Sequence, residues 1–126
     1  KGKKVVLYFY PKDQTPGCTK EACDFRDLHG GFAEKNAVVV GVSPDSLKSH
    51  AKFIEKERLP FLLLADENQE VCRLYGVWVL KKMYGREYMG VDRSTFLIDE
   101  NGILKREWRQ VKVDGHVAEV LEALEP

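Results

Sequence analysis

The sequence predicts an α/β protein in which helices cover both faces of a mainly parallel sheet. Short apolar runs, rich in β-branched and aromatic residues, alternate with segments whose apolar residues recur at helical spacing. These runs are continuous rather than alternating, which is typical of strands buried on both faces of a parallel sheet. A strong turn sequence, DENG at 99–102, adds an antiparallel hairpin near the end of the chain.

Five strands are expected, and the segment between the third and the fourth is the hardest to assign. The strands are residues 5–10, 37–42, 61–65, 94–98 and 103–109. Residues 77–92 contain two glycines and two lysines, and we expect them to be mostly loop.

Four helices accompany these strands. The first begins near Cys18, and the glycine pair at 30–31 is expected to end it early. The second follows a turn and cap at 43–46, the third runs to Leu74, and the last begins near Asp114. The order βαβαβαββα is compatible with a thioredoxin-like fold in a single domain.

The composition excludes several classes of function. The 126 residues include 20 basic and 20 acidic side chains, a balance that gives no electrostatic footprint for nucleic acid or an anionic membrane. No apolar run approaches the ~20 residues needed to span a bilayer, and no secretory signal opens the chain. Three cysteines, an odd number, argue against a disulfide-stapled secreted scaffold. We therefore expect a cytoplasmic monomer whose cysteines are buried small residues, metal ligands or reactive thiols.

Cys18 lies where a helix is predicted to begin. Thr15 is a good cap residue and Pro16 favours the first helical position, so Cys18 falls in the first turn, directly after a buried strand. The unpaired backbone amides of that turn and the helix dipole favour a thiolate there. The alternative is a core cysteine in helical phase with Ala22 and Phe25, and position alone leaves both interpretations open.

Ionisation of this thiol would not by itself make a fast enzyme. At neutral pH it increases the amount of nucleophile by at most ~30-fold, less what is lost in nucleophilicity. Orientation of the substrate and stabilisation of the charge that moves onto its oxygens must contribute more. The local candidates are the amides of Gly17 and Cys18 and the hydroxyl of Thr15.

Cys23 follows five residues after Cys18, outside any CxxC pattern. Five residues of α-helix rise about 7.5 Å and rotate about 500°, whereas a disulfide requires Cα atoms within roughly 6.8 Å and facing side chains. The two cysteines can therefore bond only if the first turns of the helix unwind. Spacing alone leaves open that Cys23 is an unrelated surface or half-buried cysteine.

Residues 11–23, PKDQTPGCTKEAC, resemble the active-site segment of the peroxiredoxin Q group, also called bacterioferritin comigratory proteins. The underlying pattern is Pro-x-x-x-Thr-x-x-Cys, and the second cysteine five residues later is a feature of a subgroup. The segments YGR at 84–86 and RSTFLID at 93–99 also resemble this group. The resemblance extends over nearly the whole chain and implies a thioredoxin fold.

The resemblance also implies an activity. The expected enzyme reduces hydrogen peroxide and alkyl hydroperoxides, is recycled by thioredoxin or a similar dithiol, and needs no metal, flavin or haem. Cys18 is then the peroxidatic cysteine and Cys23 the resolving cysteine. Pro11 shields the site, Thr15 hydrogen-bonds the peroxide, and Arg93 holds the thiolate and the substrate.

Two of the implied site residues have plain alternatives. The residues alone do not single out Arg93, which would otherwise be an exposed side chain before a strand. Glu21 is expected to support the polar network around the site, or else to be an acid on the helix surface. Gly17 is expected to offer its amide to the substrate.

The chain departs from the group in one respect and leaves some residues unassigned. Members of the group usually carry an extra segment before the first strand, so the sequence is either a piece or lacks that amino-terminal hairpin. Cys72 has no counterpart in the motif, and we interpret it as a buried small residue. The three histidines, His29, His50 and His116, form no metal-ligand spacing with the cysteines and are interpreted as structural or surface residues.

Two other classes of protein were weighed against this interpretation. A thiol–disulfide oxidoreductase would carry CxxC at the helix start, and the sequence contains no CxxC. A zinc-dependent or scaffold module would need four ligands, for which only three cysteines and scattered histidines are available.

Overall fold

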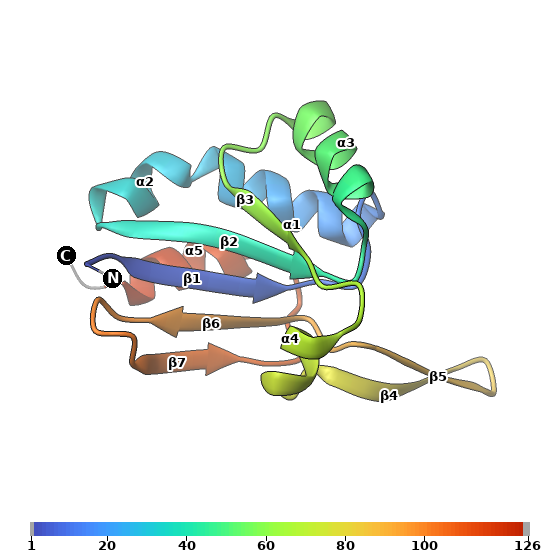
Figure 1. The fold of residues 1–126 in the computed structure, drawn as a ribbon. Helices are drawn as coiled ribbons and strands as arrows, with labels where there is room; N and C mark the ends of the chain where they lie inside the picture. The colour runs from blue at the N-terminus through green and yellow to red at the C-terminus, as the bar shows by residue number, and fades with distance from the viewer. Residues whose placement is uncertain (1, 125–126) are drawn as a thin grey trace.

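The computed structural model describes residues 2–124, which form a five-stranded sheet and a separate two-stranded hairpin (Figure 1). The strands are β1 (Lys4–Phe9), β2 (Ala37–Ser43), β3 (Leu62–Ala65), β4 (Trp78–Met83), β5 (Arg86–Val91), β6 (Ser94–Ile98) and β7 (Leu104–Trp108). The helices are α1 (Pro16–Asp27), α2 (His29–Glu34), α3 (Leu47–Glu57), α4 (Glu70–Leu74) and α5 (His116–Ala123). Across the described part of the chain, no helix combines the length and the apolarity that crossing a membrane requires.

The large sheet has the order β3-β2-β1-β6-β7. Strands β1, β2 and β3 pair in parallel, while β6 is antiparallel to both β1 and β7. The α/β thioredoxin-like fold and its closing hairpin are thereby confirmed, in a mixed sheet. Strand β1 lies at the centre, so the loop that follows it leaves from the middle of the sheet.

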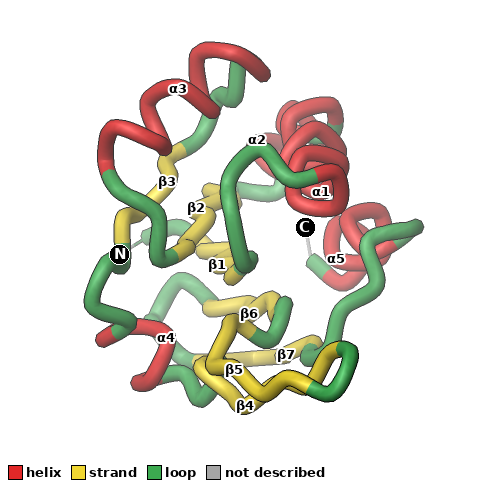
Figure 2. Tube along the Cα trace, turned by 90° about the vertical axis from the view of Figure 1, so that its right-hand side faces the viewer, coloured by secondary structure: helices red, strands yellow, loops and turns green. Residues whose placement is uncertain are grey.

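The central strand divides the core into two clusters because alternate residues point to opposite faces. Val6, Tyr8 and Tyr10 belong to the cluster that also contains the buried apolar residues of α1, α2 and α5. Leu7 and Phe9 belong to a second cluster, completed by α4 and the ends of the β4–β5 hairpin. Figure 2 shows α1 and α5 on one side of the sheet and α4 with the hairpin on the other.

The expectation that residues 77–92 are mostly loop is wrong. They form β4 and β5, which pair from Trp78↔Val91 to Met83↔Arg86. Tyr84 and Gly85 both have positive φ, 53° and 77°, which is the geometry of a two-residue turn that matches the twist of a hairpin. The turn lacks the usual Asn-Gly or Asp-Gly signal, and exposed apolar residues blur the alternation. This hairpin projects from the body of the molecule (Figure 1).

The first helix also ends differently from the expectation. Helix α1 ends at Asp27, before the glycine pair, and a second short helix, α2, contains both Gly30 and Gly31. A Cβ at Gly31 would lie 3.1 Å from Leu121 Cδ2, so this glycine allows α2 to lie close to α5. Gly31 therefore serves packing, and neither glycine ends the first helix.

We predict that Gly41→Ala destabilises the fold by about 1–3 kcal/mol through overpacking. A Cβ at this β2 position would lie 2.7 Å from Leu63 Cδ2 and 2.9 Å from Tyr8 Cζ. Urea denaturation measures the free energy of unfolding. Gly30→Ala is the matched control, because nothing lies within 4 Å of its Cβ position and alanine favours a helix. Equal stability of the Gly41 variant and wild type would contradict the packing argument.

Candidate active site

The segment between β1 and α1 places Cys18 in the first turn of a helix. Thr15 is the N-cap residue, with extended backbone angles (φ −84°, ψ 157°), and Pro16 is the first helical residue. The Thr19 amide donates to the Thr15 carbonyl across 2.8 Å. The amides of Gly17 and Cys18 precede this bond and belong to those that a helix leaves without an internal partner. The predicted position of Cys18 is confirmed.

The hydroxyl of Thr15 does not cap the helix, contrary to the expectation from its position. It donates instead to the Lys12 carbonyl, 2.9 Å away, and so closes the loop on itself. Because its hydrogen is used in this bond, its oxygen remains able to accept a hydrogen bond. Pro11 is half-buried at the start of the same loop, and its shielding of the site stays a prediction.

Arg93, in the short connection between β5 and β6, joins Cys18 to Glu21. Its Nη2 donates to the Cys18 sulfur across 3.2 Å, and its Nη1 donates to Glu21 Oε1 across 2.6 Å. Cys18 is 2% exposed and the Glu21 side chain fully buried, while the Arg93 side chain retains 16% exposure. A Cβ at Gly17 would lie 3.3 Å from Arg93 Nη2, so the glycine permits this close approach. The structure thus brings four of the expected site residues together.

Two groups of potential negative charge share the one guanidinium. Burial disfavours the charge on Arg93, but Glu21 and the Cys18 sulfur outweigh this effect and raise its pKa. Burial raises the pKa of Glu21 to about 7, although Arg93 acts in the opposite direction. Glu21 Oε2 and the Tyr8 hydroxyl are the buried side-chain polar atoms of the described chain without a hydrogen-bond partner. Burial therefore favours the neutral form of Glu21, and the bond to Arg93 favours the charged form.

Cys23 lies on the same helix but outside this group. It is half-buried, and its thiol donates to Glu57 Oε1 of α3 across 3.4 Å. Burial and this hydrogen bond raise the pKa of Cys23, which favours the thiol over the thiolate while the helix is intact. Both cysteines are free, and α1 is continuous from one to the other.

Cys72 is fully buried in α4, on the opposite face of the sheet from Cys18. Burial raises the pKa of its thiol to about 12, so it stays protonated. Its interpretation as a buried small residue is confirmed. His29 is half-buried at the start of α2, while His50 and His116 are buried.

Sequence reasoning missed Lys81, because the segment that holds it was expected to be a loop. On β4 its side chain lies along Gly90 of the paired strand, where a Cβ would come within 3.2 Å of Lys81 Cδ. Burial lowers the pKa of Lys81, with Asp92 and Cys18 acting in the opposite direction. The middle of β4 therefore carries a cation whose charge interacts with that of Cys18. Lys81 could have been singled out only if the hairpin had been recognised in the sequence.

Comparison with known proteins agrees with the geometry. The family model described as AhpC/TSA family matches residues 1–107. Peroxiredoxin Bcp of Bacillus subtilis is 63% identical over 124 residues, which are 98% of this chain and 79% of that protein. The structure of the Xanthomonas campestris bacterioferritin comigratory protein, from a study of its alkyl peroxide reduction, superposes with a TM-score of 0.93 at 46% identity and covers 98% of this chain and 78% of its own. The structure of a cysteine-to-serine mutant of Xylella fastidiosa PrxQ superposes with a TM-score of 0.94 at 44% identity. It covers 98% of this chain and 77% of its own.

A buried thiol at a helix start, bound by an arginine within a thioredoxin-like fold, defines a thiol-based peroxidase. The chain belongs to the AhpC/TSA family, as a peroxiredoxin of the Bcp, or PrxQ, group.

We predict that Glu21→Gln changes how stability depends on pH. The carboxyl pKa is 4.5 in the reference state and about 7 in the fold, so the folded protein binds this proton more tightly. The stabilising contribution is fully present below 4.5, is lost as pH rises through 7, and amounts to at most about 3 kcal/mol. The difference in free energy of unfolding between wild type and the glutamine variant, measured in urea from pH 4 to 8, should decline over this window. A constant difference would show that Arg93 keeps Glu21 ionised throughout.

Proposed function

We propose that the Cys18 thiolate attacks the distal oxygen of a hydroperoxide. The sulfur displaces the rest of the molecule, which leaves with a proton as water or an alcohol, and Cys18 becomes a sulfenic acid. The observation that carries this step is the 3.2 Å hydrogen bond from Arg93 Nη2 to the Cys18 sulfur at a helix start. Hydrogen peroxide and alkyl hydroperoxides are the proposed substrates. The study of the Xanthomonas relative, whose subject is alkyl peroxide reduction, supports the second class.

The residues around the sulfur have separate roles in this proposal. Arg93 and the amides of Gly17 and Cys18 stabilise the negative charge as it moves from sulfur to the peroxide oxygens. The Thr15 oxygen accepts a hydrogen bond from the peroxide hydroxyl, since its own hydrogen is engaged with Lys12. Orientation of this kind, more than ionisation, makes the attack fast.

The second step is condensation of the sulfenic acid with Cys23, which forms a disulfide and releases water. In the intact helix the two residues are separated by a rise of about 7.5 Å and lie on different sides. The first turns of α1 therefore unwind in the oxidised form. Leaving the helix also takes Cys23 away from Glu57, whose hydrogen bond favours the protonated thiol.

The third step returns the enzyme to its dithiol form. An external dithiol, proposed to be thioredoxin, attacks the Cys18–Cys23 disulfide and leaves with the two oxidising equivalents as its own disulfide. The three free thiols fit a reducing compartment such as the cytoplasm, and we propose that the protein acts there as a monomer.

Cys18→Ser is expected to abolish peroxidase activity, because an alcohol at this position is not ionised at neutral pH. Peroxide consumption in the presence of thioredoxin, its reductase and the nicotinamide reductant measures the activity. Cys72→Ser is the matched control and should retain it, since Cys72 lies on the other face of the sheet. Retained activity in the Cys18 variant would exclude the mechanism.

Cys23→Ser is expected to spare the first step and block the second. After one equivalent of hydrogen peroxide, a sulfenic-acid probe should label Cys18 in this variant, and intact-mass measurement should find no intramolecular disulfide. Wild type treated identically should give the disulfide and little labelling. A disulfide in the variant, formed with Cys72, would contradict the assignment of Cys23.

A further inference from the structure

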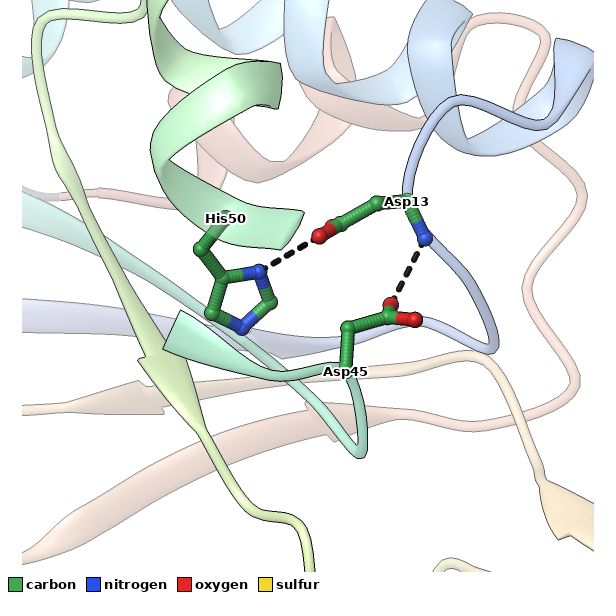
Figure 3. Close-up of side chains that lie close together, drawn as sticks. All are labelled: Asp13, Asp45 and His50. Atoms are coloured by element: carbon green, nitrogen blue, oxygen red, sulfur yellow. Dashed lines mark hydrogen bonds and ion pairs between the residues drawn. The ribbon is translucent and has the colours of Figure 1, made fainter. Parts of the chain in front are cut away.

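A second polar cluster lies at the loop that leads to Cys18. It consists of Asp13, Asp45 and His50, whose ligand atoms lie within 4.8 Å of one another (Figure 3). His50 comes from α3, Asp45 from the turn after β2, and Asp13 from the loop between β1 and α1. The Asp13 and His50 side chains are each 2% exposed. None of the three belongs to the group formed by Cys18, Glu21 and Arg93.

The surroundings of the His50 ring require a positive charge. Its Nδ1 lies 2.7 Å from Asp13 Oδ2, and its Nε2 lies 2.9 Å from the Leu64 carbonyl oxygen. Both of these oxygens are acceptors, whereas a neutral imidazole has one N–H and one lone pair. A neutral ring would therefore set a lone pair against an acceptor in a buried place. Because the pKa of Asp13 is lowered and its carboxyl group is ionised, only the imidazolium satisfies both contacts.

The same contacts argue against a metal ion. Asp13 Oδ1 accepts from the Tyr10 hydroxyl across 2.6 Å, and Asp13 Oδ2 accepts from Ser49 Oγ across 2.7 Å. Asp45 Oδ2 accepts from the Asp13 amide and from Ser43 Oγ, each across 2.7 Å. Both oxygens of Asp13 and one oxygen of Asp45 are thus occupied by hydrogen-bond donors, and the imidazolium already supplies the positive charge.

Asp13 fixes the part of the loop where the backbone is strained. The next residue, Gln14, has φ 62°, in the left-handed region that costs a non-glycine residue about 1–2 kcal/mol. Both the side chain and the amide of Asp13 are held by groups outside the loop, from α3 and from the turn after β2. Thr15 follows Gln14 directly, and α1 begins at the next residue. The conformation that presents Thr15 and Cys18 therefore depends on the bonds of Asp13.

From this arrangement we infer that charged His50 is a positioning residue, which acts through Asp13 to hold the loop that carries Thr15 and leads to Cys18. It favours the helical form that attacks peroxide, and it opposes the unwinding that lets Cys23 reach Cys18. The inference rests on the two-step cycle proposed above. His50 touches neither sulfur, so its effect is on the population of the folded loop.

The charges around the pair determine the pH range in which this restraint operates. Burial lowers the pKa of His50, but Asp13, the Leu64 carbonyl and Asp45 outweigh it and raise the value above 6.5. Burial raises the pKa of Asp13, and the bonds from His50, Tyr10 and Ser49 outweigh it and lower the value below 3.8. Burial also raises the pKa of Tyr10, which remains a neutral donor.

The sign of the pH dependence follows from the raised pKa of His50. Its contribution is fully present below pH 6.5 and is lost as pH rises through the higher value in the fold. Asp13 stays ionised throughout this range because its pKa is lowered. The restraint on the loop therefore weakens on the alkaline side.

The test separates the two chemical steps in wild type, His50→Gln and a matched control, His116→Gln. His116 is also buried, but it lies in α5 and bonds to Thr95 across 2.8 Å. Stopped-flow tryptophan fluorescence follows the oxidation of Cys18 by hydrogen peroxide. Formation of the disulfide is followed by alkylating the remaining thiols at set times and measuring the protein mass. Both measurements are made from pH 6 to 9. At pH 6.5 the His50 variant should oxidise roughly tenfold more slowly than wild type and form the disulfide several-fold faster. The ratio of the oxidation rate of the His50 variant to that of wild type should approach one at alkaline pH. Ionisation of the Cys18 thiol affects both proteins equally and does not change this ratio.

A measurement on wild type keeps the inference testable if the His50 variant does not fold. The imidazole Cε1 protons, followed by NMR, should show His50 titrating above free imidazole and His116 below it, because burial lowers the pKa of His116. Asp13→Asn should lower the pKa of His50, because it removes the charge that stabilises the imidazolium. Titration of His50 at or below the free value, or a His50 variant whose rates and pH profile match wild type, would overturn the inference.

Failure of the proposed cycle would look different. Wild type itself would then form no sulfenic acid or no disulfide, whatever the state of His50. An effect of His116→Gln equal to that of His50→Gln would also overturn the inference, since it would reduce the role of His50 to general stability.

Discussion

The structure depends on one half-buried guanidinium that must serve two acidic partners. Arg93 binds the Cys18 sulfur and the Glu21 carboxylate at once, in a place where an uncompensated charge would be costly. Cys18 and Glu21 come from the helix after β1, and Arg93 directly precedes β6, 75 and 72 residues away in sequence. The antiparallel pairing of β1 with β6 brings these residues together in space. The site therefore requires this order of strands, because only neighbouring β1 and β6 bring Arg93 to Cys18 and Glu21.

The proposed cycle adds a second constraint, because the same helix must be intact in one step and unwind in the next. An intact first turn gathers amides at the sulfur, whereas a disulfide to Cys23 requires that turn to open. The fold keeps these demands apart by attaching the helix unevenly. Its buried residues Cys18, Ala22 and Phe25 belong to the core, while polar bonds hold the loop before the helix and one arginine holds the Cys18 sulfur. Polar attachments respond to charge, which apolar packing does not.

Much of the fold could be predicted from the sequence, because apolar runs and turn residues report local structure directly. Strands β1, β2, β6 and the start of α1 follow from such patterns. The β4–β5 hairpin could not be recognised, since its turn uses Tyr84-Gly85 and most of its apolar side chains are exposed. Cys18 was accessible from local chemistry. Arg93 was accessible only through family resemblance, and His50 not at all, because the contacts of both are distant in sequence.

The burial of Cys72 on the far face of the sheet has a consequence for the fidelity of oxidation. A sulfenic acid condenses with whichever thiol meets it first, and the chain contains three cysteines. Sealing one of them behind the central strands leaves a single intramolecular partner for the oxidised residue. In the proposed cycle, the sheet between Cys18 and Cys72 thus selects Cys23 as the partner of Cys18, and the thiols themselves need no specific recognition.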